Sequence, residues 1–546
     1  MADPDGPEDP RPSSEEAHSA FTPPLGVPQP PAPEDESPTS EFALPQGVST
    51  QPPAPPPSFT RTSTLPTAFT PAEGVPMVRL TKEAPWQDRM RTLLRMPVGD
   101  RPLPEIVQRH DVTGPAVPRV LDLTLRIGEL LLAGGEGAED VEAAMFAVSH
   151  AYGLERSEPN VTFTLISISH QPSLVEDPVT ASRVVRRRGT DYTRLSAVFD
   201  LVDDITNEDE DVTLEEAYRR LASIRRNRHP YPGWVLTAAN GVLAGSAAVL
   251  VGGDFVVFLA AMVGAMLGDR LAWLCAGRGL PEFYQFVVAA MPPAAMGVAL
   301  TLLGSWVAWD GKPSAVITGG LFALLPGRAL VAGVQDGLTG YYITAAARLL
   351  EVMYFFIAIV IGVLIVLYLG VHLDAQLNPD AAPVNSQRPV AQIIVSVTLS
   401  LAFAVLLQQE RRTVLMVSLN GGVAWLVYGS MHYTAHIHPV VATAVAAGLV
   451  GLFGQLFSRY QFSSALPYVT AAIGPLLPGS ATYFGLLGIA QNELDRGLAS
   501  LSKAVALALA IAVGVNLGGE ISRLFLRAPG ATRGSARRAA KRTRGF

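Results

Sequence analysis

The chain contains two similar Pro-Gly stretches, LLPGRALVAGV at residues 324–334 and LLPGSATYFGL at residues 476–486. Both lie inside long apolar runs, and the second follows the first by 152 residues. Proline cannot donate the hydrogen bond of a helix interior and its ring clashes with the preceding turn, whereas glycine tolerates the freed backbone. Each stretch therefore predicts a helix that is interrupted inside an apolar segment.

The same shift of 152 residues matches further positions without a gap: Thr318 falls on Thr470, Gly333 on Gly485 and Leu349 on Leu501. Ten apolar segments, each near the ~20 residues of a membrane-crossing helix, lie at roughly 234–252, 255–274, 284–306, 314–333, 351–370, 390–408, 413–430, 439–457, 466–487 and 503–520. A unit of five spans that occurs twice must run in opposite directions in its two copies. The sequence thus predicts a mostly α-helical membrane protein of ten transmembrane helices in two inverted five-helix repeats, 231–371 and 390–522.

Composition and charge agree with a membrane protein, because 49% of the residues are hydrophobic and 16% are charged. Basic residues lie on one side if the spans alternate: those of 224–230, Arg270, Arg278, Arg348, Arg411, Arg412, Arg459 and those of the tail 523–546. The positive-inside rule then places both termini in the cytoplasm and the loop 372–389 outside the plasma membrane. The basic tail 523–546 is expected to contact anionic lipid, and no nucleic-acid partner is expected.

The region before the first span has a different character. Residues 1–80 hold 20 of the 44 prolines, and the Pro-rich acidic stretch 1–110 is predicted to be a disordered tail and linker. Residues 111–230 predict a small cytoplasmic domain, either α+β or helical. Its amphipathic patterns predict helices at 122–135, 139–153, 191–205 and 213–227, and strands at 161–169 and 181–189.

The two interrupted spans are the candidate transport site. Half-helix N-termini offer N–H donors and a partial positive charge, which suits a carboxylate, and interrupted segments at matching positions of two halves are typical of transporter sites. Proline kinks with a packing role only are the alternative. The candidate substrate-binding residues lie at the breaks or are polar residues of other spans: Pro326, Gly327, Arg328, Pro478, Gly479, Ser480, Thr482, Asn240 and Asn420.

A proton-coupled carrier also needs a carboxylate that can change its charge. Four acids in or beside apolar segments are candidates for proton coupling, and each could instead be an interfacial residue at a helix end: Asp254, Asp336, Glu351 and Glu520. Four more acids gather at the start of the helix predicted at 139–153, where they either stabilise the helix dipole or form a gate at the cytoplasmic mouth: Glu136, Glu139, Asp140 and Glu142.

Enzyme chemistry finds no support in the motifs. The chain has no Walker A, G-x-S-x-G or H-E-x-x-H motif, which argues against a hydrolase and against an ATP-driven pump. The single cysteine, Cys275, excludes an intrachain disulfide and a cysteine-based metal site. The histidines of MHYTAHIH at 431–438 lack a neighbouring carboxylate. No metal and no other cofactor is expected.

Several segments together resemble the threonine/serine exporter (ThrE) family, in its form with both membrane halves in one chain. They are RIGELLLAGGEGAEDVEAAM at 126–145, RRRGTDYTRLSAVFDLVDDI at 186–205, YPGWVLTAANGVLAGSAAVLVGGDF at 231–255, ALLPGRALVAGVQDGLTG at 323–340 and PYVTAAIGPLLPGS at 467–480. The resemblance implies export of threonine and serine driven by the proton motive force. A split form of the family resembles a dicarboxylate exporter. The resemblance supplies no binding residues.

The expected function is therefore secondary active export of small amino acids, threonine and serine, with protons as the coupling ion and the lipid bilayer as surroundings. Homo-oligomerisation is left open. Three alternatives stay open as well: a dicarboxylate exporter of the same fold, a membrane-bound enzyme acting through residues 111–230, and a passive channel or scaffold.

Overall fold

The computed structural model describes a defined part of the chain: residues 117–173, 175–186, 189, 191–207, 211–226, 230–307, 312–373, 389–461, 464–490 and 493–525. Within these ranges, the side chains of residues 304–307, 328, 459–461, 486, 487, 490 and 523–525 are not described. The predicted tail 1–110, most of the predicted loop 372–389 and most of the basic segment 523–546 lie outside the described residues.

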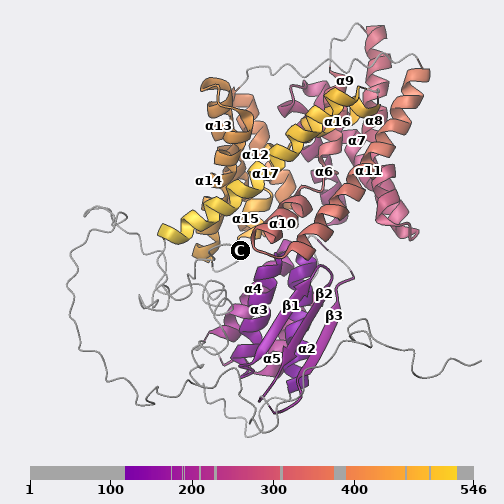
Figure 1. Ribbon diagram of the computed structural model, residues 1–546. Helices are drawn as coiled ribbons and strands as arrows, with labels where there is room; N and C mark the ends of the chain where they lie inside the picture. Colours follow the sequence, from indigo (N-terminus) through magenta and orange to yellow (C-terminus); the bar gives the residue numbers. More distant parts are fainter. Residues whose placement is uncertain are drawn as a thin grey trace, which may run out of the picture. The chain divides into compact units, whose positions relative to one another are not determined.

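Residues 117–226 form an α+β domain, the N-terminal domain below. Its elements are α2 (Val117–Gly134), α3 (Ala138–Ala151), β1 (Ser157–Thr162), β2 (Leu165–His170), β3 (Val179–Val184), α4 (Tyr192–Thr206) and α5 (Leu214–Arg226). The strands form one antiparallel sheet in the order β1-β2-β3 (Figure 1). Helix α3 contacts β1, and α2 contacts β2 and β3. Ile166 and Ile168 of β2 are fully buried, as the alternation of the strand requires.

The prediction of one strand over 161–169 is wrong, because the chain turns there and forms the β1–β2 hairpin. Phe163 lies in the turn with φ 52°, a left-handed conformation that bulky residues rarely adopt. The Phe163 N–H donates to Oγ1 of Thr344 at 3.1 Å. Apolar and β-branched residues continue through the turn, so the alternation in the sequence hides it. The second predicted strand, 181–189, overlaps β3 but continues past its end at Val184.

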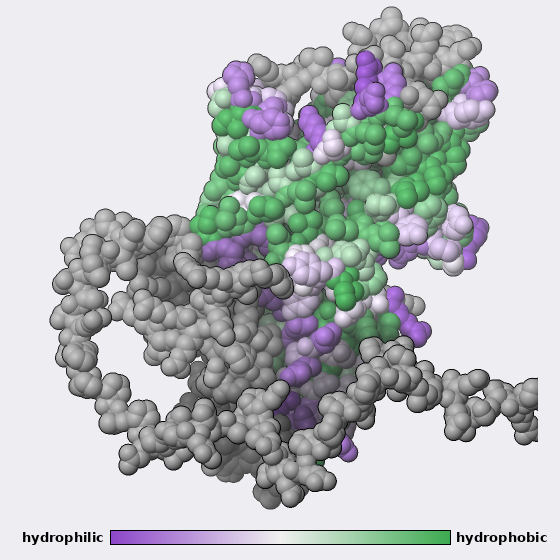
Figure 2. Space-filling view, in the orientation of Figure 1, coloured by the Kyte–Doolittle hydropathy of each residue, from purple (hydrophilic) through white to green (hydrophobic). Residues whose placement is uncertain are grey.

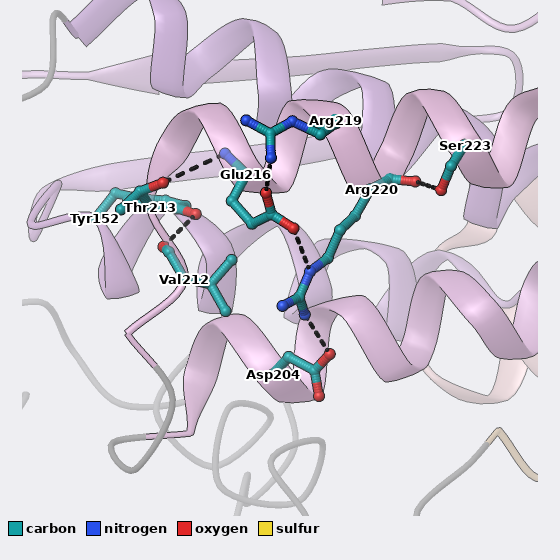
Figure 3. A network of polar contacts seen from close by, with 8 residues as sticks. All are labelled: Tyr152, Asp204, Val212, Thr213, Glu216, Arg219, Arg220 and Ser223. Carbon is teal, nitrogen blue, oxygen red and sulfur yellow. Dashed lines mark hydrogen bonds and ion pairs between the residues drawn. The ribbon is translucent and has the colours of Figure 1, made fainter.

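Helix α5 forms an ion pair with α4, which Figure 3 shows together with the polar contacts beside it. Arg220 forms ion pairs with Asp204 of α4 at 2.9 Å and with Glu216 of its own helix at 3.0 Å. Ala217 and Leu221 are the buried residues of α5. Exposed ion pairs contribute at most about 1 kcal/mol each. We expect α5 to be among the less stable elements of the N-terminal domain for this reason.

Eight helices of the described residues are long and apolar enough to cross a membrane. They are α6 (Gly233–Leu250), α7 (Phe255–Gly277), α8 (Glu282–Val307), α11 (Tyr342–His372), α12 (Pro389–Leu406), α13 (Arg411–Gly429, continued by the π-helical turn η2, Ser430–Thr434), α14 (Pro439–Gln461) and α17 (Leu494–Phe525). Hydrophobic residues cover the face of these helices that is in view in Figure 2. Large exposed side chains such as Leu267 and Ile361 suit lipid and not water. The chain is therefore a mostly helical membrane protein.

The fourth and ninth apolar segments are each interrupted, as the Pro-Gly pairs predict. The fourth consists of α9 (Pro313–Phe322) and α10 (Gly327–Leu338). The ninth consists of α15 (Leu466–Thr470), the 3-10 turn η3 (Gly474–Leu476) and α16 (Gly479–Ala490). A count of ten spans takes each interrupted segment as one crossing, and this count stays a prediction.

The helices after each break correspond closely. Helices α10 and α16 begin and end 152 residues apart, and α11 and α17 begin 152 residues apart. Both α11 and α17, with 31 and 32 residues, start earlier than the predicted spans at 351 and 503. Their first two turns include the charged residues Arg348 and Arg496, which lower the hydropathy by which a span is recognised.

Candidate functional site

The two breaks share one backbone geometry. At the first, the Gly327 N–H donates to the Leu325 carbonyl at 2.8 Å; at the second, the Gly479 N–H donates to the Leu477 carbonyl at 2.9 Å. Each glycine thus closes a three-residue turn around a proline, and Pro326 has the φ of −78° that its ring favours. The helix that follows starts on the proline carbonyl in both cases, with the N–H of Leu330 or Thr482 as donor at 3.0 Å.

The two breaks also touch each other. An ideal β-carbon on Gly327 would lie 2.9 Å from Cδ1 of Leu477, and one on Gly479 would lie 3.5 Å from Cδ1 of Leu325 and 2.7 Å from Cδ2 of Phe322. Leu325 and Leu477 are themselves 152 residues apart, so each leucine packs on the glycine of the other break. Glycine is required here because the opposite break leaves no space for a side chain.

A cavity of about 200 Å³ lies at the second break, lined by Pro478, Gly479 and Ser480. Other walls come from α6, from Phe322 at the end of α9, and from α17. Four further lining residues carry aromatic rings or hydroxyl groups: Trp425, Tyr428, Tyr433 and Thr443. No charged side chain is among the described residues that line it. The first-turn N–H groups of α16 after Gly479 have no acceptor within their own helix, as at any helix start.

Three of the nine predicted substrate-binding residues, Pro478, Gly479 and Ser480, line this cavity. Pro326 and Gly327 form the first break, and neither is a lining residue. Thr482 is buried, and its hydroxyl donates to the Pro478 carbonyl at 2.9 Å, so it supports the break. Arg328 is the second residue of α10, and its side chain lies outside the described part of the chain.

The two predicted asparagines lie in helix–helix contacts. Asn240 of α6 donates to the Ala265 carbonyl of α7 at 3.3 Å, and Asn420 of α13 donates to the Val450 carbonyl of α14 at 3.4 Å. Both side chains are buried, and neither lines the cavity. Interhelical hydrogen bonds of this kind hold membrane helices together.

The four candidate acids for proton coupling lie on different helices and differ in burial. Asp254 is exposed and caps α7 by accepting from the Val257 N–H at 2.9 Å. Glu351 lies partly buried on α11, and Glu520 lies exposed on α17. Asp336 differs, because its side chain is 1% exposed and forms an ion pair with Arg348 at 3.2 Å. An acid that the sequence analysis passed over, Asp269 of α7, accepts a hydrogen bond from Thr237 of α6.

Asp336 belongs to a buried polar cluster, the α3 junction, between the N-terminal domain and α10–α11. Its Oδ1 accepts from the Ala138 N–H at 3.0 Å, and Arg348 donates to the Glu136 carbonyl at 3.0 Å. Three further contacts belong to the junction. Tyr341 OH donates to the Glu142 carboxylate, and the Phe163 N–H donates to Thr344 Oγ1 at 3.1 Å. The Glu136 carboxylate accepts from Oγ of Ser464, which precedes α15, at 3.1 Å. The sequence analysis did not predict this junction, because it placed Arg348 in a loop between spans. Only the folded chain brings α3 against Arg348.

Burial is the main cause that raises the pKa of Glu142 above its ordinary value. Hydrogen bonds from Tyr341 OH and from the Val161 N–H oppose the rise, and the negative charge of Glu139 adds to it. The α3 junction therefore holds a carboxyl group whose charge is costly where it lies.

A second set of contacts, the α4 junction, joins the start of α4 to other membrane helices. The Tyr192 N–H donates to the Leu407 carbonyl at 3.1 Å, and Thr193 Oγ1 donates to the Gln408 carbonyl at 2.6 Å. Tyr192 OH donates to Oγ1 of Thr470 in α15 at 3.2 Å. The N-terminal domain thus contacts α10, α11 and Ser464 through the α3 junction, and α15 and the residues that follow α12 through the α4 junction.

A metal site has no support within the described residues, where no group of three His, Cys, Asp or Glu side chains could hold an ion.

Comparisons with known proteins agree with a fused, two-segment chain. A family model described as "Putative threonine/serine exporter" matches residues 122–370, and one described as "Threonine/Serine exporter, ThrE" matches residues 392–520. The "Probable threonine/serine exporter" of Mycobacterium tuberculosis is 34% identical over 410 residues, covering 73% of this chain and 76% of that protein. The "Threonine/serine exporter" of Corynebacterium glutamicum is 31% identical over 422 residues, covering 76% and 84%. No solved structure matches the chain. The chain therefore belongs to the threonine/serine exporter (ThrE) family, a family of transporters and not of enzymes.

Proposed function

We propose that the chain is a secondary active exporter of threonine and serine, and that the cavity at the second break is its substrate site. The observation that carries this proposal is the position of the cavity. It lies at an interrupted helix, and its lining residues come from both halves of the membrane region. The names of the two relatives support the substrate class.

The uncharged lining favours an amino acid over a dicarboxylate. Burial of a charge without a partner is costly, and a dicarboxylate would bring two negative charges into a cavity whose described lining carries no cation. A zwitterionic amino acid has no net charge. Its carboxylate can accept from the first-turn N–H groups of α16, and its ammonium group can lie against the rings of Trp425, Tyr428 or Tyr433.

Two inverted five-helix repeats form the second part of the proposal. Three observations support these repeats: the matching turns at the breaks, the reciprocal leucine–glycine contacts, and the bounds of α10 and α16, which are 152 residues apart at both ends. With ten crossings and basic residues on one side, both termini and the N-terminal domain are cytoplasmic. The N-terminal domain contacts Gln408 just before α13, whereas Trp425 and Tyr428 of the cavity lie near the far end of α13. This arrangement corresponds to a carrier closed towards the cytoplasm.

Proton coupling completes the proposal. Four acids were expected to serve it, of which Asp336 is buried in an ion pair while the other three lie apart from one another. An imposed pH gradient, acidic outside, should drive threonine out of the compartment that corresponds to the cytoplasm.

The experiment is counterflow in proteoliposomes with a panel of amino acids and dicarboxylates, followed by transport under a pH gradient. A carrier exchanges labelled threonine against unlabelled threonine, whereas a channel does not concentrate the label. Ser480→Ala should weaken threonine exchange, and Ser502→Ala, which changes an exposed serine of α17, is the matched control. Exchange of succinate without exchange of threonine would overturn the substrate assignment.

A further inference from the structure

Helix α10 connects the two polar regions of the molecule. Its first residue, Gly327, packs against Leu477 at the second break. Near its other end, Asp336 lies in the α3 junction. The twelve residues of α10 form a rod of about 18 Å at 1.5 Å per residue. A displacement at the junction is therefore transmitted to the breaks.

The break separates α10 from α9, so the two are not one continuous helix. The position of α10 depends on packing against α11, α17 and the opposite break, and Asp336 adds a buried ion pair and a hydrogen bond to this packing. An anion in the last turn of a helix is unfavourable for that helix, but the first turn of α3 favours an anion. Asp336 is thus better suited to the N-terminal domain than to its own helix. The guanidinium of Arg348 in α11 lies 3.2 Å from the Asp336 carboxylate and compensates its negative charge. The same guanidinium donates to the Glu136 carbonyl.

The N-terminal domain bridges the two proposed halves of the membrane region. It contacts the first half through Asp336, Tyr341 and Thr344. It contacts the second half through the Gln408 carbonyl and Thr470. In alternating access one half moves against the other. A domain that is bonded to both halves on one side cannot keep every one of these contacts while that side opens.

We propose that the N-terminal domain undocks from the α3 junction in each transport cycle, and that Asp336 and Arg348 are positioning residues that couple this undocking to helix α10 and the substrate cavity. The inference rests on the proposed function. It assigns to the N-terminal domain the role of a cytoplasmic gate.

The first test is a reversible cross-link across the junction. Cys275→Ser removes the single cysteine, and Phe163→Cys with Thr344→Cys then places two thiols where the Phe163 N–H lies 3.1 Å from Thr344 Oγ1. This contact makes the two residues direct neighbours, as a disulfide requires. Oxidation should reduce threonine counterflow by about tenfold or more, and a reductant should restore it. Ser169→Cys with Thr180→Cys is the matched control, because these paired residues of β2 and β3 lie within the N-terminal domain.

Full counterflow in the oxidised Phe163–Thr344 protein would overturn the inference. The proposed function would still stand, because the Cys275→Ser protein would exchange threonine. Absence of threonine exchange in the wild-type protein would instead overturn the proposed function.

The second test measures undocking directly. Thr344 is 2% exposed when docked, so a cysteine there reacts with a thiol reagent only after undocking. In the Cys275→Ser background, threonine should raise the rate of labelling at Thr344→Cys during exchange, and Asp336→Asn should raise it without threonine. Ser223→Cys on the exposed face of α5 is the reference for reagent reactivity. Equal labelling rates with and without threonine, and with and without Asp336→Asn, would show that the pair does not control a gate.

Discussion

Leu477 occupies the space that a β-carbon on Gly327 would need, at 2.9 Å from its ideal position, and Leu325 lies at the ordinary contact distance of 3.5 Å from the corresponding position on Gly479. Reciprocal contacts of this kind arise when two similar units meet around a twofold axis. Here the two units are helix breaks of one chain, separated by 152 residues. Their contact brings the first break next to the cavity of the second.

The glycines at the breaks should not tolerate large side chains. Gly327→Leu and Gly479→Leu force extra atoms into a packed contact, which typically costs about 1–3 kcal/mol. Threonine counterflow should fall by about tenfold or more for each variant. Gly277→Leu is the control, because a β-carbon there meets nothing within 4 Å. Full transport by both break variants would remove the breaks from the mechanism.

The reciprocal contact also predicts a specific rescue. Gly327→Ala brings a methyl group against Leu477, so Leu477→Ala should restore the activity that Gly327→Ala removes. At Gly479 the methyl group would meet Phe322 at 2.7 Å, whereas Leu325 lies at 3.5 Å, so Phe322→Ala and not Leu325→Ala should restore the activity that Gly479→Ala removes. Coupling energies between contacting residues are about 0.5–3 kcal/mol. Strictly additive effects in a double-mutant cycle would contradict the contact.

Trp425 should contribute to binding of the ammonium group. Trp425→Leu should raise the KM for threonine by up to about tenfold, because cation–π contacts contribute roughly 0.5–2 kcal/mol. Inhibition by the hydroxy acid that lacks the amino group should change little. Trp273→Leu on α7, where the side chain is 69% exposed, is the matched control. An equal loss of threonine and hydroxy-acid binding would argue for a packing role of Trp425.

Arg348 should matter for stability far more than an exposed arginine. Arg348→Ala leaves the buried charge of Asp336 without its partner, and such losses cost about 3–5 kcal/mol. Arg496→Ala removes an exposed pair with Glu493 and should cost less than about 1 kcal/mol. Thermal unfolding in detergent measures both. Equal melting temperatures for the two variants would show that the α3 junction is not closed in solution.

The raised pKa of Asp200 predicts how pH affects the stability of the N-terminal domain. Burial, and then the charges of Asp204, Asp203 and Glu410, raises the pKa of Asp200 to about 6. Because the pKa of this carboxyl group is higher in the folded than in the unfolded state, the bound proton stabilises the folded domain at low pH. This stabilisation is lost as the pH rises through about 6. Asp200→Asn should therefore flatten the fall in melting temperature between the ordinary carboxyl value of 3.8 and about pH 6. The exposed Asp177→Asn should leave that fall unchanged; an equal fall in Asp200→Asn would refute the assignment.

The interrupted helices could be predicted from the sequence because proline and glycine act through local backbone chemistry. Pro478, Gly479 and Ser480, which line the cavity, were named as candidates for the same reason, and their role in binding stays a prediction. Asn240 and Asn420 show the limit of this approach: a polar residue in an apolar segment can face a cavity or a neighbouring helix, and only packing decides which. Arg348 shows it again, since its burial depends on α3, which lies 200 residues earlier in the chain.

The Phe163 turn escaped prediction because its conformation is stabilised from outside the strand. Its N–H bonds to Thr344, far away in sequence, and no local glycine or asparagine marks the turn. The orientation of the two halves and the count of ten crossings still rest on loop charge and on the repeat.

Protection of a cysteine in the cavity tests the central claim most directly. Ser480→Cys in the Cys275→Ser background places one thiol at the second break. Threonine should slow its modification, with half-maximal protection near the KM for exchange, and succinate should not. Modification at the same rate in saturating threonine, in a protein that still exchanges threonine, would show that the substrate binds elsewhere.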